Sequence, residues 1–158
     1  MKQVLPIRKK LHFRNFDYKG SEYAYFITIC TRNKNNHFLE SEKAECIAKE
    51  LEHRIKSKEI ILYCYCIMPN HVHLLMSLNE NYKGSLSLSN WISAFKRYTS
   101  KIFKENFGLS NIWQLNFYEH IVRSEKSLEL IADYILTNPI RKNMVENWKE
   151  FKYSQVCI

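Results

Sequence analysis

Two segments of strand length, residues 59–68 and 71–78, are separated only by Pro69 and Asn70. The first is an apolar run, the second places histidines between apolar side chains, and proline followed by asparagine signals a turn. So short a connection joins antiparallel strands, because parallel strands need a crossover of a dozen or more residues. We therefore predict a β-hairpin, around which the rest of the chain must fold.

Side chains alternate between the two faces of the second hairpin strand. His71, His73 and Leu75 would point to one face, and Val72, Leu74 and Met76 to the other. Two imidazoles on one face of a rigid strand supply half of a metal site. The same spacing is also typical of exposed or hydrogen-bonded histidines on a sheet, so both interpretations stay open at this point.

The remaining segments predict two further strands and three helices. The strands are expected over residues 22–31 and 113–123. The helices are expected over 41–58, with Ser41 as N-cap, over 86–107, ended by Gly108, and up to about Thr137, capped by Ser124 or Ser127. This order favours an α+β fold, a ferredoxin-like antiparallel sheet with helices packed on it, and we expect residues 1–158 to form a single domain.

The chain is basic, with 24 Lys and Arg residues against 16 Asp and Glu and a formal net charge of +8. Such a balance favours a nucleic-acid or anionic-membrane partner, although a solvated basic surface would give the same number. No apolar run is long enough for a signal peptide or a membrane span. We therefore expect a cytoplasmic protein with no membrane partner.

Basic residues gather in three parts of the sequence: near the start, on one side of the predicted helix 86–107, and after the last helix. We predict that they contact phosphates, although for each of them a solvated surface position is the alternative. They are Arg8, Lys9, Lys10, Arg14, Arg97, Lys101, Lys104, Arg141 and Lys142.

Five cysteines, an odd number, do not suggest a disulfide framework. Cys64 and Cys66 lie on the first hairpin strand, close in sequence to His71 and His73. A structural Cys₂His₂ zinc site is therefore an alternative interpretation. Paired cysteines inside an apolar strand are more often small buried hydrophobes, which weighs against the zinc site.

Tyr134 lies on the last predicted helix, on the flank of an apolar stripe that would face the core. Asn138 follows one turn later, so its amide would lie beside the tyrosine ring. The phenol could therefore reach a cleft and act chemically. The alternative is a tyrosine that packs its ring at the core edge and leaves its hydroxyl in water.

The run YCIMPNHVHLLM, residues 65–76, resembles the HUH motif of small single-tyrosine transposases, in which a bulky apolar residue separates two histidines. Segments 25–31, 95–99, 112–123, 133–139 and 148–154 also resemble parts of that family, in the same order and spacing. The chain resembles in particular the REP-associated tyrosine transposases, which process repeated palindromic DNA hairpins.

The resemblance implies site roles. His71 and His73 would ligate Mg²⁺ or Mn²⁺, Tyr134 would be the nucleophile, and Asn138 falls where related enzymes place a polar residue that completes the metal site. His120 is in a familiar position, and its expected role is to position DNA or to support the sheet.

The reaction that the resemblance implies is cleavage and rejoining of single-stranded DNA at hairpins through a 5′-phosphotyrosine. It requires no small-molecule cofactor, and the protein would act as a monomer or a homodimer. Two other functions stay as alternatives: a non-catalytic nucleic-acid-binding domain and a structural zinc protein.

Overall fold

The predicted hairpin forms the middle of the sheet. In the computed structural model, which describes residues 23–82 and 87–157, β2 (Ile60–Met68) pairs with β3 (His71–Leu78) in antiparallel register, with Met68 opposite His71. On the other side of β3 lies β1 (Ala24–Cys30), and Thr28 stands opposite His73. The predicted phosphate contacts Arg8, Lys9, Lys10 and Arg14 lie outside the described residues.

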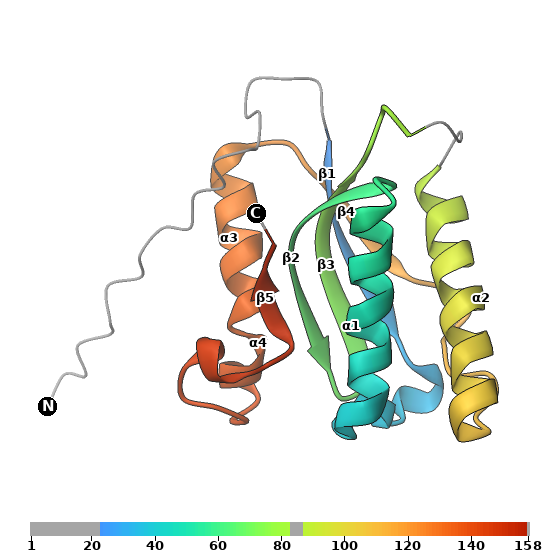
Figure 1. Cartoon of the computed structure of the whole chain (residues 1–158). Coiled ribbons are helices and arrows are strands. Elements are labelled where there is room, and N and C mark those ends of the chain that lie inside the picture. Colours follow the sequence, from blue (N-terminus) through green and yellow to red (C-terminus); the bar gives the residue numbers. More distant parts are fainter. Residues whose placement is uncertain (1–22, 83–86, 158) are drawn as a thin grey trace, which may run out of the picture.

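Five antiparallel strands form the described sheet in the order β4-β1-β3-β2-β5 (Figure 1). β4 (Tyr118–Val122) pairs with β1, and the short β5 (Ser154–Val156) adds to the free edge of β2. The first four strands have the order of a ferredoxin-like sheet, with helices between β1 and β2, and between β3 and β4. The predicted α+β fold class is therefore confirmed.

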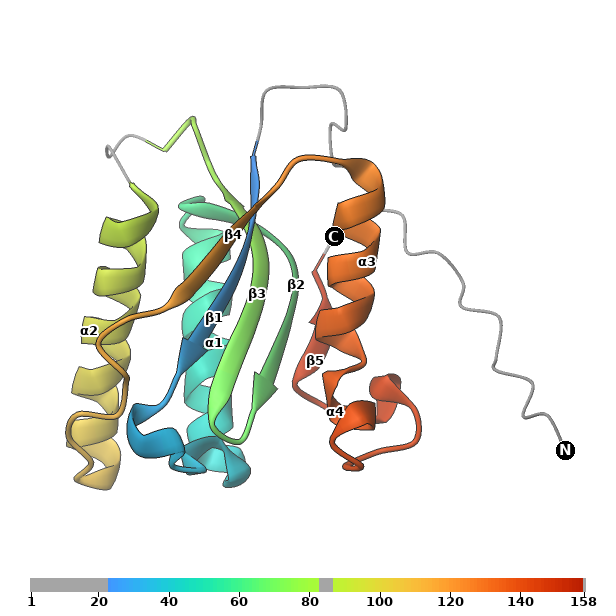
Figure 2. The same ribbon diagram turned by 180° about the vertical axis from the view of Figure 1, so that it is seen from behind.

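Helices cover both faces of the sheet (Figures 1 and 2). α1 (Ser41–Lys56) and α2 (Leu88–Phe107) lie on one face, and α3 (Glu125–Leu136) with the short α4 (Asn138–Arg141) lies on the other. Each face has its own buried apolar cluster. The α1–α2 side takes in Ile27, Val72, Leu74, Trp91 and Phe95, and the α3 side Leu75, Cys66, Ala132 and Ile135.

Two helix ends match their predictions and one differs by a residue. Ser124 caps α3 by accepting a hydrogen bond from the Ser127 N–H, and Gly108 ends α2 in the left-handed conformation with φ 66°. Ser41 is the first helical residue of α1, and Glu40 occupies the cap position without a side-chain hydrogen bond.

The predicted strand 113–123 is too long. Only Tyr118–Val122 joins the sheet, while Trp113 forms an isolated bridge with Thr31. The cause is the indole of Trp113, which is buried in the α1–α2 core, packs against Phe38 and donates a hydrogen bond to the Thr99 hydroxyl. Burying this ring takes the chain away from the strand direction before β4 begins.

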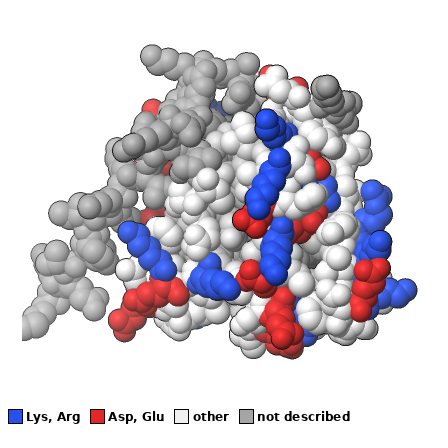
Figure 3. Space-filling view, viewed as in Figure 1, with Lys and Arg blue, Asp and Glu red and all other residues white. Residues whose placement is uncertain are grey.

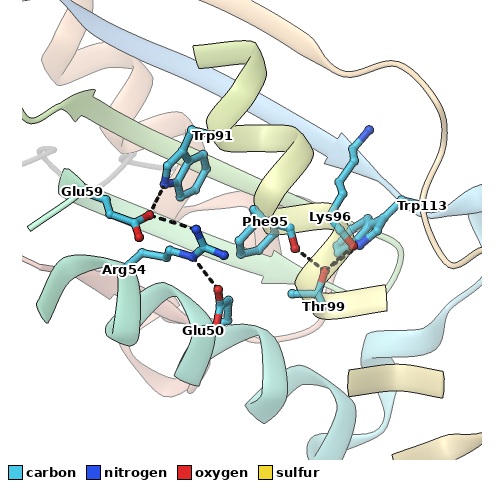
Figure 4. A network of polar contacts seen from close by, with 8 residues as sticks. All are labelled: Glu50, Arg54, Glu59, Trp91, Phe95, Lys96, Thr99 and Trp113. Atoms are coloured by element: carbon cyan, nitrogen blue, oxygen red, sulfur yellow. Dashed lines mark hydrogen bonds and ion pairs between the residues drawn. The ribbon is translucent and has the colours of Figure 1, made fainter. Parts of the chain in front are cut away.

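A buried polar network ties α1 to the start of β2 and to α2 (Figure 4). The Arg54 guanidinium pairs with Glu50 and Glu59, and the Trp91 indole donates to Glu59. These contacts offset part of the desolvation cost of burying the charged groups. Within the described residues, no helix is long and apolar enough to cross a membrane.

Candidate active site

His71 and His73 lie on the face of β3 that is covered by α3, as the alternation predicted, with their ring centroids 4.6 Å apart. Each uses its Nδ1 atom inside the protein. His71 Nδ1 lies 2.7 Å from Asn70 Oδ1, and His73 Nδ1 lies 2.8 Å from Thr28 Oγ1. When Nδ1 carries the proton and donates it to these oxygens, both Nε2 atoms keep a free lone pair for a ligand.

Both histidines are neutral at pH 7. Burial, together with a smaller effect of nearby Lys142, lowers the pKa of His71 to about 4. Burial also lowers the pKa of His73 to about 3, with additional effects of His71 and Arg141. The pair therefore offers two neutral imidazoles, the form that binds a metal. The effects of Arg141 and Lys142 also show that α4 and the residue after it lie near the histidines.

Tyr134 lies on α3 beside the histidines and on the flank of the buried stripe of Leu128, Ala132 and Ile135. Its ring centroid is 5.7 Å from that of His73, and 46% of the residue remains exposed. The Arg141 guanidinium lies over the ring, 4.1 Å from its centroid, and also donates hydrogen bonds to the Tyr134 carbonyl and to Thr137 Oγ1. The nucleophile predicted from the sequence is thus accessible, and a cation lies against it.

Asn138 begins α4 one turn after Tyr134 and is only 4% exposed. Its Oδ1 atom is buried and has no hydrogen-bond partner within the described part of the chain. An unsatisfied buried acceptor costs about 1–3 kcal/mol. This orphaned oxygen, together with two free imidazole nitrogens, is a donor set that fits a divalent cation.

Phe26 and Thr28 were missed by the sequence reasoning. Both side chains of β1 reach the histidine face, and the Phe26 ring contacts His73, Tyr134 and Tyr118 at centroid distances of 5.5, 6.0 and 5.8 Å. Tyr118 is 55% exposed at the edge of this cluster. Alternation along β1 could have shown that residues 26 and 28 share a face, but only the pairing of β1 with β3 shows that it is the face of the histidines.

The other predicted site residues are spread over both layers. His120 is exposed on β4 and stands opposite Phe26, on the histidine face. Arg97, Lys101 and Lys104 are exposed on α2, which covers the opposite face. Over the α1–α2 face, basic and acidic side chains alternate (Figure 3), and Lys101 lies 3.9 Å from Glu105. Whether these cations contact DNA stays a prediction.

The zinc interpretation does not fit the structure. Cys66 stands opposite His73, but both Cys64 and Cys66 are fully buried. Burial raises the pKa of the Cys66 thiol to about 12 and that of Cys64 well above its usual value, so both are neutral thiols inside the apolar layer under α3. Within residues 23–82 and 87–157, no three His, Cys, Asp or Glu side chains are grouped to hold a metal.

Comparisons with known proteins identify a family and a fold. The family described as "Transposase IS200 like" matches residues 19–138. A Haemophilus influenzae protein provisionally named a REP-associated tyrosine transposase is 32% identical, over 86% of this chain and 80% of its own. An Escherichia coli K12 REP-associated tyrosine transposase is 27% identical, over 90% and 80%. The solved structure of a REP-associated tyrosine transposase bound to a REP hairpin has the same fold, with a TM-score of 0.66, 24% identity and coverage of 91% and 81%.

Proposed function

The chain belongs to the family of IS200-like transposases, and on that premise we propose that it cleaves and rejoins single-stranded DNA through a covalent bond to Tyr134. The observation that carries the proposal is the meeting of two neutral imidazoles, an accessible phenol and an orphaned buried amide oxygen on one face of the sheet. A non-catalytic DNA-binding domain has no use for this set.

In this proposal His71 Nε2, His73 Nε2 and Asn138 Oδ1 hold Mn²⁺ or Mg²⁺. The mixed nitrogen and oxygen ligands fit Mn²⁺ better than Mg²⁺, which prefers oxygen alone. When bound, such a cation draws charge from the scissile phosphate and orients it. Asn70 and Thr28 fix the imidazole rings from behind, so that the metal-binding nitrogens need no rearrangement.

Tyr134 then supplies the nucleophile. Its oxygen forms a bond to phosphorus while the bond to the 3′ oxygen breaks, which leaves a 5′-phosphotyrosine and a free 3′-hydroxyl. The phenol loses one proton and the departing oxygen gains one, so no acid or base is consumed overall. A second 3′-hydroxyl can reverse these changes and rejoin the strand. Arg141, whose guanidinium already lies on the phenol ring, is placed to pair with the phosphate under attack.

A hairpin is the proposed DNA target, because the solved relative of this fold is bound to a REP hairpin. In the described structure, the half-exposed ring of Tyr118 lies at the edge of the site, where it can stack on an unpaired base. This favours a substrate with single-stranded nucleotides at the cleavage position.

The test is incubation of the purified protein with a single-stranded hairpin oligonucleotide and Mn²⁺. We expect a covalent protein–DNA adduct on a denaturing gel, absent in Tyr134→Phe and in EDTA. Tyr153→Phe, which removes a hydroxyl bonded to Ser41 and Glu45 on the other side of the sheet, is the matched control and should keep the adduct. An adduct that survives Tyr134→Phe, or that forms equally without a divalent metal, would refute the proposal.

A further inference from the structure

The loop of residues 114–116, between α2 and β4, is held rigidly although it lies at the surface. Lys96 Nζ donates hydrogen bonds to the carbonyls of Gln114, Leu115 and Asn116 at 2.7, 3.1 and 3.2 Å. An ammonium group has three donors, so the loop uses all of them. The Gln114 N–H also bonds to the Cys30 carbonyl. The loop is therefore attached both to α2, from which Lys96 projects in Figure 4, and to the end of β1.

Leu115 is the most exposed large apolar residue of the described chain, at 94%. A single exposed leucine is ordinary on a mobile loop. Here the backbone carbonyls on both sides are fixed by Lys96, so the side chain is held out into solvent. A rigidly presented aliphatic side chain resembles the apolar wedges that nucleic-acid-binding proteins place against bases.

Beside this leucine lies an open cleft of about 860 Å³. Its described lining contains two cations, four side-chain amides and one indole, and no acidic residue. The lining residues are Arg32, Asn33, Lys34, Asn111, Trp113, Gln114, Leu115 and Asn116. Cations pair with phosphates, and amides can both donate to and accept from base edges. The chemistry of the cleft is therefore complementary to nucleotides.

The backbone around the cleft is locally strained. Asn33, Lys34 and Asn111 all have positive φ, between 53° and 55°, a conformation that is costly for a lysine in particular. Such strain persists only where the surroundings hold it, and it clusters at binding sites. Three of the five non-glycine residues with positive φ in the described chain line this one cleft.

The cleft adjoins the catalytic face through the end of β1. Cys30 stands opposite His71, and Thr31 bonds to the Asn70 carbonyl through both its N–H and its hydroxyl. The same Asn70 fixes the ring of His71. The cleft begins at the next residue, Arg32. A DNA strand that has its scissile phosphate at the histidines would therefore reach the cleft by crossing the end of β1.

We propose that this cleft binds the unpaired nucleotides next to the cleaved hairpin, with Leu115 packed against a base and Arg32 and Lys34 on the phosphates. The inference rests on the proposed function, of which it names the substrate segment. In this inference the side-chain amides of the cleft recognise the bases of the flanking nucleotides, whereas the histidines and Tyr134 do not contact bases.

Binding, measured by fluorescence anisotropy in EDTA, tests this without any cleavage. The probes are one hairpin with single-stranded extensions and the same hairpin without them. Leu115→Ala should weaken binding of the extended hairpin about tenfold, as expected when one buried aliphatic contact is lost, and that of the blunt hairpin less than twofold. Val156→Ala, an exposed apolar residue on the opposite edge strand, is the control and should change neither.

Arg32→Gln combined with Lys34→Asn tests the phosphate contacts, and asparagine tolerates the positive φ at 34. The pair should weaken binding of the extended hairpin and lower its salt dependence, with the slope of log K against log salt falling by about 1.4. The control is the double variant Lys49→Gln with Lys56→Gln on α1, which removes the same amount of positive charge away from the cleft. Wild-type protein that binds neither hairpin refutes the proposed function. Wild-type binding with unchanged affinity in Leu115→Ala, or an equal loss on the blunt hairpin, overturns this inference alone.

Discussion

Asn138→Leu should make the metal-free protein more stable and the metal-dependent reaction impossible. The Asn138 amide oxygen is buried and unsatisfied, which costs about 1–3 kcal/mol in a protein interior. Leucine has a similar volume and no polar atom, so the penalty disappears. Taking about 1 kcal/mol as the net gain after some loss of packing fit, a chain of this size should gain about 2–4 °C in Tm.

The assay is thermal unfolding in EDTA and in Mn²⁺, followed by circular dichroism. Bound metal stabilises the native state by RT ln(1 + [L]/Kd), about 2.7 kcal/mol when the metal is at 100 times its Kd. Wild-type protein should gain this in Mn²⁺, whereas Asn138→Leu should gain much less. The order of stabilities would therefore reverse between the two buffers, as no general effect of the substitution could do.

Asn106→Leu, at an exposed position of α2, is the matched control and should change the free energy of unfolding in either buffer by no more than the usual surface effect, about 0.5 kcal/mol. The reasoning fails if Asn138→Leu is less stable than wild type in EDTA. It also fails if the variant gains as much from Mn²⁺ as the wild type does, since the amide would then not be a ligand.

Three further predictions concern the groups around the histidines. Thr28→Val removes the partner of His73 Nδ1 and should weaken Mn²⁺ binding, measured by calorimetry, about 10–100-fold; unchanged affinity would show that the hydroxyl does not orient the ring. His73 stays unprotonated in the native state at pH values where an unfolded histidine, with a pKa near 6.5, takes up a proton. The free energy of unfolding in EDTA should therefore be constant above that pH and fall as the pH drops toward about 3. His73→Gln should make this fall less steep in urea titrations, and an unchanged slope would contradict the low pKa. Arg141→Lys keeps the charge but loses the planar group over the Tyr134 ring. It should lower the rate of adduct formation at saturating DNA more than it lowers the affinity for DNA. The reverse pattern would show that Arg141 only binds DNA.

The sequence predicted those parts of the site that depend on one element at a time. Alternation along the hairpin strand placed His71 and His73 on one face, and the helical period placed Tyr134 on a flank with Asn138 one turn later. In the structure all four residues have these positions. The order of elements also predicted the sheet, because short connections between strands leave few topologies.

What the sequence could not predict depends on pairing between distant segments. Thr28 bonds to His73 only because β1 lies beside β3, a register across 45 residues of sequence. The predicted length of β4 was wrong for a similar reason, since the burial of Trp113 against Phe38 and α2 outweighs the strand preference of its neighbours. The orphaned oxygen of Asn138 is visible only once every neighbouring donor has been placed.

Val72 lies between the two histidines and is fully buried in the opposite layer, against the α1–α2 core. The strand that carries the two imidazoles is therefore anchored from the opposite face, by apolar side chains of the α1–α2 core. Evolution can adjust the reactivity of this protein by exchanging aliphatic and aromatic side chains around Val72, while the catalytic residues stay the same.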